Sequence, residues 1–315
     1  MTTVLALARL RRLTPFFASL ALVAGTFTIV HGANKRIVLI AGKPSHPPGM
    51  HEFRGGSMLL QKALGGVKGV TVDVYTNGWP TRTVDGVVSD DNAALDTADA
   101  VLIYSDGGGG HPAIQRDHMK VLDALAAKGV GLGFAHYAVE VPAGAPGEAL
   151  QRWMAGYYET NFSVNPMWKP AFDALPKHPI TRGVKPFATH DEWYFNMRWA
   201  PDASSKGKLT PILTAKPSDE VRKGPYVSPK GPYPHIVADS GKVETMMWVY
   251  ERPDGGRSFG FTGGHTHANW GDVNQRKVML NALLWIAKVD VPARGVEDGI
   301  TAADLTGNLD PKTPR

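Results

Sequence analysis

The stretch Lys35-Arg36-Ile37-Val38-Leu39-Ile40-Ala41 is a continuous apolar run, and a loop of glycine, proline and histidine follows it from Gly42 to His51. Such a run is typical of a parallel strand that is buried on both faces. A helix is expected next, over Glu52–Leu64, and further strands over Val70–Tyr75 and Ala100–Tyr104. This alternation of strands and helices predicts a parallel sheet with helices on both faces.

The alternation continues along the rest of the chain. The segment from Pro112 to Lys128 predicts a helix, with Gly129 just past its end, and Val130–Ala135 predicts a fourth strand. A closing helix is expected over Asp272–Lys288. Four more segments are expected to be strands: Pro211–Ala215, Ile236–Ala238, Glu244–Tyr250 and Arg257–Thr262.

One long segment departs from this pattern. Residues from about Gly144 to Pro201 are rich in aromatic side chains and lack clear periodicity. We interpret them as an insertion or lid beside the edge of the sheet where the strands end. The expected fold is therefore a three-layer α/β/α arrangement with a mostly parallel sheet and an aromatic-rich insertion.

The first 33 residues have the pattern of an export signal. Three arginines lie between positions 9 and 12, Phe16–Val30 is uncharged and mostly apolar, and the small residues Gly32 and Ala33 follow. This pattern favours a cleavable signal; an uncleaved membrane anchor is the alternative, and the one route to membrane contact that we expect. We expect residues 1–33 to be a signal peptide, 34–290 one α/β domain and 291–315 a polar tail. The protein would then be periplasmic or extracellular.

Composition excludes several partners and several kinds of chemistry. The 315 residues carry 34 Lys and Arg against 29 Asp and Glu. Without residues 1–33, which contain three arginines and no acidic residue, the net charge is 31 − 29 = +2. No basic cluster is interleaved with aromatic residues, so we expect no nucleic acid partner. The chain has no cysteine, which excludes a thiol nucleophile and thiolate metal ligands. A metal would need histidine and carboxylate ligands.

Histidines follow several of the expected strands, at the edge where open α/β sheets bind their ligands. His136 follows Val130–Ala135 at a turn similar to the sharp elbow that presents a nucleophile in hydrolases. His265 and His267 follow Arg257–Thr262 in a glycine-rich loop, where both can reach one ion. Imidazoles serve as bases, acids or metal ligands at neutral pH. The alternative for each is a structural histidine bonded to backbone groups.

Acidic and aromatic residues lie together in the segment His190-Asp191-Glu192-Trp193-Tyr194. Carboxylates beside aromatic rings are typical of sugar sites, although a turn with packed aromatics has the same sequence pattern. Asp106 begins a glycine-rich stretch that either lets the backbone approach a ligand or makes a tight turn into a helix. His51 and His111 are expected to have supporting or structural roles.

The order of four segments resembles a ThuA-like, or trehalose utilisation, domain over roughly Lys35 to Val289. These segments are Arg36–Gly42, Gly131–Tyr137, His190–Tyr194 and Gly263–His267. The resemblance implies a flavodoxin-like fold of the class I glutamine amidotransferase-like superfamily, and a role in carbohydrate catabolism. It also implies substrates among oxidised disaccharides and their keto-sugar derivatives.

The resemblance does not extend to glutamine hydrolysis. Classical members of the superfamily carry a cysteine at the elbow, near the place where His136 stands here. Because the chain has no cysteine, hydrolysis of glutamine through a thioester is excluded.

Together these observations predict an exported protein that acts on a glycoside or keto-glycoside as a hydrolase or lyase. The predicted catalytic residues are His136, His265 and Glu192. The predicted residues for binding a small carbohydrate are His46, Asp106, Gly108, Tyr137, Trp193 and His267. A divalent metal is compatible with this site, and its candidate ligands are His136, His265 and His267.

Two other functions are compatible with the sequence. The first is a non-catalytic sugar-binding protein, in which the same side chains only hold the ligand. The second is a hydrolase of amide or ester bonds that uses Ser45 or Ser105. Neither serine lies in a Gly-x-Ser-x-Gly elbow, which argues against the second function.

Overall fold

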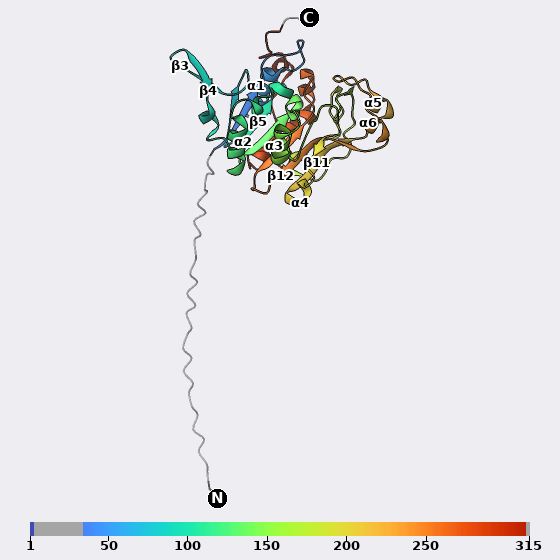
Figure 1. The fold of residues 1–315 in the computed structure, drawn as a ribbon. Helices are drawn as coiled ribbons and strands as arrows, with labels where there is room; N and C mark the ends of the chain where they lie inside the picture. Colours follow the sequence, from blue (N-terminus) through green and yellow to red (C-terminus); the bar gives the residue numbers. More distant parts are fainter. Residues whose placement is uncertain (3–33, 313–315) are drawn as a thin grey trace. The chain divides into compact units, whose positions relative to one another are not determined.

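A seven-stranded sheet forms the centre of the protein in a computed structural model that describes residues 1–2 and 34–312. The expected signal peptide falls almost entirely outside the described residues. The strand order is β11-β12-β13-β6-β5-β1-β2 (Figure 1). Five strands are parallel: β1 (Lys35–Ala41), β2 (Val70–Tyr75), β5 (Ala100–Tyr104), β6 (Gly131–Ala135) and β13 (Arg257–Phe261). Two antiparallel strands complete one edge: β12 (Glu244–Glu251) and β11 (Lys208–Ala215).

Helices cover both faces of this sheet, as the sequence predicts. The first helix, α1 (Phe53–Leu64), and the last, α7 (Val273–Ile286), pack together on one face. The helices α2 (His118–Ala127) and α3 (Ala145–Met154) pack on the other. Alternate side chains of β1 enter the two resulting cores, because successive residues of a strand point to opposite faces. The predicted flavodoxin-like α/β fold is confirmed.

Two predicted elements differ from the structure. Ile236–Ala238 was expected to be a strand and lies instead in the short helix α6 (Pro234–Ala238). A short apolar run does not distinguish the two states, whereas proline is well suited to the first position of a helix. The helix expected from Pro112 to Lys128 is interrupted before α2, where Arg116 has a φ of +48°.

The aromatic-rich segment is an insertion whose rings are packed inside the protein. It contains α3 and two pairs of very short strands: β7 (Gly156–Tyr157) with β10 (Arg198–Trp199), and β8 (Met167–Trp168) with β9 (Asp191–Glu192). Trp153, Tyr158 and Trp193 are all at most 1% exposed. The insertion therefore extends the hydrophobic core, and its short strands bring Asp191 and Glu192 to the edge of the sheet.

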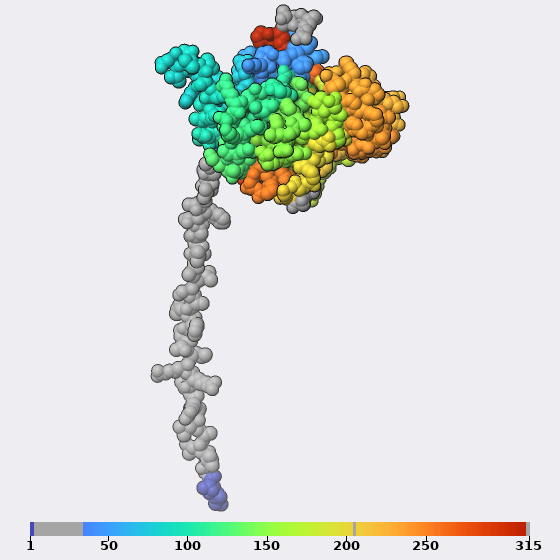
Figure 2. Space-filling model, viewed as in Figure 1, coloured from blue at the N-terminus to red at the C-terminus, as the bar shows by residue number. Residues whose placement is uncertain are grey.

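Smaller elements surround this framework. The hairpin of β3 (Thr81–Val84) and β4 (Val87–Asp90), which the sequence pattern did not reveal, projects from the domain (Figures 1 and 2). The short helices α4 (Ala203–Lys206) and α5 (Asp219–Lys223) flank β11 in the sequence. Among the described residues, no helix has the length and apolar character needed to span a membrane.

The C-terminal tail returns to the start of α1 and is anchored there by a buried charge pair. The side chains of Lys312 and Glu52 are 5% and 1% exposed, and Lys312 Nζ lies 3.3 Å from Glu52 Oε1. Lys312 also donates to the carbonyl oxygens of Met50 and His51. The backbone N–H of Asp310 donates to Glu52 Oε2 at 2.9 Å. The tail thus holds the loop between β1 and α1 in place.

The substitution Lys312→Met should destabilise the fold, because it leaves the Glu52 carboxylate buried without its cation. Removing one partner of a buried pair typically costs about 3–5 kcal/mol, to be measured as the free energy of urea unfolding. The matched control is Lys120→Met, since Lys120 pairs with Asp117 on the surface and its side chain is 83% exposed. Equal stability of the two variants would contradict this account of the tail.

Candidate functional site

Polar loops meet above the carboxyl ends of four neighbouring strands. β13, β6, β5 and β1 are adjacent and parallel, so the loops that follow them share one edge of the sheet. His51 follows β1, Asp106 follows β5, His136 follows β6 and His265 follows β13. Glu192 reaches the same place from β9. All of these except Asp106 are at most 5% exposed.

Three imidazole rings and one carboxylate converge on a single point. His51 Nε2 lies 3.0 Å from His136 Nε2 and 2.9 Å from His265 Nδ1. Glu192 Oε2 lies 2.8 Å from the same His265 nitrogen. One possible ligand atom from each side chain lies within 4.8 Å of the others. We call His51, His136, Glu192 and His265 the histidine cluster.

The outer nitrogens of two of these rings face oxygen atoms that only accept hydrogen bonds. His51 Nδ1 lies 2.7 Å from Asp106 Oδ1, and His136 Nδ1 lies 3.1 Å from the carbonyl oxygen of Thr262. Each Nδ1 therefore carries the proton, and each neutral ring presents a lone pair at Nε2. These two lone pairs point toward each other across 3.0 Å. A cation bound by both nitrogens would remove the repulsion.

A proton is poorly suited to be that cation. Burial lowers the pKa of His136 well below its ordinary value, and the neighbouring His51 and His265 lower it further. Burial likewise lowers the pKa of His51, with added contributions from His46 and His265. Both rings therefore stay neutral at physiological pH, which is the form that binds metal ions.

The carboxylate of Glu192 is held by an amide. Asn165 Nδ2 donates to Glu192 Oε1 at 2.8 Å, which leaves Oε2 directed at the histidines. Burial raises the pKa of Glu192, and the interaction with His265 partly opposes this effect. A buried carboxylate with a raised pKa binds a proton or a metal ion more strongly than an exposed one.

Asp191 fixes the loop that carries His265. Its two carboxylate oxygens accept hydrogen bonds from the backbone N–H groups of Gly264 and Thr266, at 2.8 and 2.9 Å. The hydroxyl of Tyr104 donates to the carbonyl oxygen of Gly264, whose φ of +104° favours glycine. The backbone N–H of His51 donates to the carbonyl oxygen of His265 at 2.9 Å, which joins the two histidine loops directly.

His136 occupies a strained backbone position. Its φ is +56°, in the left-handed region that a buried non-glycine residue adopts at a cost of about 1–3 kcal/mol. It follows the last residue of β6, where the sequence resembles a nucleophile elbow. Here the turn directs an imidazole into the cluster, and no cysteine is present to act as the nucleophile.

The donor set fits a divalent metal ion. Three imidazole nitrogens with a nearby carboxylate oxygen form a typical site for Zn²⁺, and imidazole also suits Fe, Ni and Cu. Asp106 and the Thr262 carbonyl hold two of the rings from behind, as outer partners do in zinc proteins. The converging lone pairs of His51 and His136 are the structural feature that supports this fit.

The structure brings together most of the residues predicted from the sequence. His136, His265 and Glu192 lie in the cluster, and Asp106 supports it from the second layer. The His46 ring stacks on His51 with centroids 3.6 Å apart, and its side chain is 38% exposed at the open side of the site. The Tyr137 and His51 rings are 6.1 Å apart.

Three other predicted residues lie elsewhere or have backbone roles. His267 Nε2 contacts the carbonyl oxygen of Leu305 at 3.0 Å, so this ring faces the tail. Trp193 is fully buried beneath Gly263, and its indole N–H donates to Thr189. Gly108 donates its backbone N–H to the carbonyl oxygen of Glu140 and has a φ of +60°. We therefore place His267 and Trp193 outside the site.

His51, for which the sequence predicts only a supporting or structural role, lies at the centre of the cluster. Its ring lies between His136 and His265, and it follows the first strand, where the direction of the chain through the sheet reverses. Its position after the first strand was the available signal. His111, by contrast, is structural, since its two ring nitrogens contact the Ala113 N–H and the Ala138 carbonyl. Asn165 gave no sequence signal.

Comparisons with known proteins agree with this fold. The family model described as "Trehalose utilisation", ThuA, matches residues 62–286. A putative ThuA-like protein from Bacteroides uniformis is 12% identical with a TM-score of 0.55, over 81% of this chain and 91% of that chain. One from Parabacteroides merdae is 16% identical with a TM-score of 0.50, over 89% and 93%. No curated protein matches the chain. At these identities the two structures support the fold alone.

Purified protein should bind one equivalent of Zn²⁺ at the histidine cluster. The substitution Asp106→Ala should weaken this binding about 10- to 100-fold, because it removes the acceptor that orients His51. The affinity is measured by competition with a chelating dye. Asp117→Ala is the control, since Asp117 is an exposed carboxylate on the surface. Undiminished affinity in Asp106→Ala would rule out the orienting role.

Proposed function

The chain belongs to the trehalose utilisation family, ThuA, and we propose that it is an enzyme that opens the glycosidic bond of a keto-glycoside. The family points to a role in carbohydrate metabolism, while the substrate and the reaction are our proposal. The observation that carries the proposal is the convergence of three imidazole nitrogens and one carboxylate at the carboxyl edge of the sheet. Such a cluster suits chemistry on a carbonyl group.

A keto-glycoside can be cleaved by elimination. The ketone makes the C–H group beside it acidic. A base can therefore remove that proton, and the electron pair of the C–H bond is then delocalised onto the ketone oxygen as an enolate. The electron pair of the enolate then forms a carbon–carbon double bond to the anomeric carbon. The bond from that carbon to the glycosidic oxygen breaks, and the oxygen takes up a proton. Addition of water to the double bond then gives the free keto-sugar.

The residues of the cluster divide this work between them. His51, His136 and His265 would hold a divalent cation, which when bound supplies a Lewis acid for the ketone oxygen. Glu192 is the base: burial raises its pKa, and Asn165 leaves its second oxygen directed into the site. The proton that Glu192 accepts is the one that the departing oxygen requires.

A tyrosine beside the cluster contributes a hydrogen-bond donor. Tyr194 Oη lies 3.4 Å from His136 Nε2, and burial raises the pKa of Tyr194 well above its ordinary value. The hydroxyl therefore keeps its proton and can donate to a substrate oxygen. Its position supports a role in orientation rather than in proton transfer.

The alternative of a sugar-binding protein without activity receives less support. Such proteins present aromatic rings to the sugar face, whereas Trp193 and Tyr194 are at most 2% exposed. The buried groups at this edge are instead imidazoles and a carboxylate. Sugar binding without turnover would favour the alternative.

Two substitutions test the assignment of roles. Glu192→Gln should lower kcat for a keto derivative of trehalose about 10²- to 10⁴-fold and keep the bound metal, because only the base is lost. His136→Ala should lose both turnover and metal. Glu148→Gln, on the exposed face of α3, is the matched control. Full turnover in Glu192→Gln would refute the role of base.

We also propose that the reaction takes place outside the cytoplasm, on the basis of the arginines before position 13 and the apolar run Phe16–Val30. Expression of the full chain should then yield a periplasmic or secreted protein that lacks residues 1–33. Intact-mass measurement of the fractionated protein checks this expectation. An unprocessed chain confined to the cytoplasm would contradict it.

A further inference from the structure

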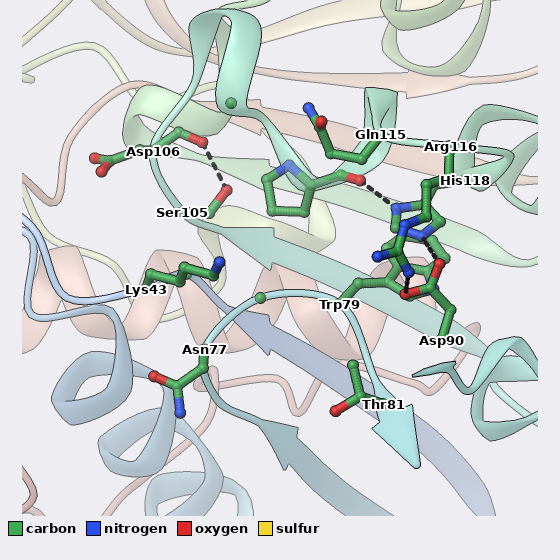
Figure 3. Close-up of a pocket in the computed structure, with 14 residues that line it drawn as sticks. Lys43, Asn77, Trp79, Thr81, Asp90, Ser105, Asp106, Gln115, Arg116 and His118 are labelled. Atoms are coloured by element: carbon green, nitrogen blue, oxygen red, sulfur yellow. Dashed lines mark hydrogen bonds and ion pairs between the residues drawn. The ribbon is translucent and has the colours of Figure 1, made fainter. Parts of the chain in front are cut away.

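Figure 3 shows a cavity of about 560 Å³, which adjoins the histidine cluster at Asp106. Asp106 links the two, because it lines the cavity and also contacts His51 Nδ1 at 2.7 Å. The cavity lies over the ends of β2, β1 and β5, where the sheet order reverses direction. Open α/β sheets commonly bind ligands at this position.

One wall of the cavity is fixed by stacked and paired side chains. The rings of Trp79 and His118 are parallel within 7°, with centroids 3.9 Å apart. Asp90 holds this wall from β4: its carboxylate contacts His118 Nε2 at 2.9 Å and Arg116 at 2.6 Å. Since Trp79 is only 7% exposed, it offers no free face on which a sugar ring can stack.

Two residues that line the cavity have left-handed backbone conformations. The φ values are +65° for Asn77 and +48° for Arg116. Strain of this kind in residues other than glycine is concentrated at ligand sites and binding loops. Arg116 also interrupts the predicted helix before α2, and this interruption places its side chain beside Asp90.

The charges of the cavity leave one cation without a partner. Asp90 is engaged by Arg116 and His118, and Asp106 is engaged by His51. Lys43 makes no hydrogen bond or ion pair within the described part of the chain, and Figure 3 shows its amine directed into the cavity. The Lys43 ammonium is therefore the charged group in the cavity that is available to a ligand, and a carboxylate is its natural partner.

We propose that this cavity is a second sugar subsite, which binds a carboxylate-bearing sugar unit through Lys43. The inference rests on the proposed function, because the keto-sugar unit would lie at the histidine cluster. The carboxylate-bearing unit would lie in this cavity, on the other side of the scissile glycosidic bond. Asp106 forms the boundary between the two positions. The natural substrate is then an acidic disaccharide derivative, with a uronate or aldonate on the side of β2.

Recognition in this subsite depends on charge and hydrogen bonds. The fixed wall of Trp79 and His118 limits the position of the ring, and Lys43 supplies a charge-assisted hydrogen bond to the carboxylate. A neutral hexose fills the same space but leaves the ammonium without its partner. The subsite should therefore distinguish the two sugars mainly through the carboxylate.

Calorimetry on the full-length, metal-loaded protein tests the subsite with D-glucuronate and D-glucose as probes. Glucuronate should bind about tenfold more tightly than glucose, the usual effect of a hydrogen bond to a charged group. Lys43→Gln should abolish this preference, and Lys43→Arg should retain it. Lys68→Met is the control, since Lys68 is exposed before the start of β2, at the opposite end of the sheet.

The outcome is separable from that of the proposed function, because the measurement requires binding and no turnover. Equal affinities for glucuronate and glucose, or a preference that survives Lys43→Gln, would overturn the subsite. A preference that Lys43→Gln removes supports the subsite even if keto-glycosides are not turned over. Acetate, tested alongside, should bind far more weakly than glucuronate; equal binding would show that the carboxylate alone is recognised, against a sugar subsite.

Discussion

The contact between two lone pairs determines what this site can be. Asp106 and the Thr262 carbonyl fix the protons of His51 and His136 on their outer nitrogens, so their inner nitrogens face each other at 3.0 Å as acceptors. Two neutral imidazoles gain nothing from such a contact in a buried place, and burial opposes a proton between them. A divalent cation would satisfy both rings and also His265, and it would account for the polar groups that are buried at one edge of an otherwise apolar sheet.

Much of the scaffold around this contact follows from the sequence. The apolar runs of β1, β5, β6 and β13 predict parallel strands, and parallel strands place their following loops at one edge. On this basis the sequence predicts one site that contains His136, His265 and Glu192. The elbow after β6 was also recognisable, and the φ of +56° at His136 is the backbone strain that such a turn requires.

Other features depended on contacts that a sequence does not reveal. His265 and His267 look equivalent in the sequence, but the hydrogen bonds of Asp191 to Gly264 and Thr266 turn the first inward, while the second meets the tail. The sequence predicts that Trp193 binds carbohydrate. In the structure it is a core residue, since its ring lies under Gly263. The importance of His51 arises from its contacts with His136 and His265, which are far from it in the sequence. The polar tail is anchored through Lys312 and Glu52 beside His51, by contacts that its composition does not indicate.

Anomalous diffraction from crystals grown with Zn²⁺ would decide whether the histidine cluster is a metal site. We expect one anomalous peak about 2.0–2.1 Å from His51 Nε2, His136 Nε2 and His265 Nδ1, the usual zinc–nitrogen distance. Absence of a peak at this point, with the three rings unchanged in their positions, would contradict the assignment of a metal site.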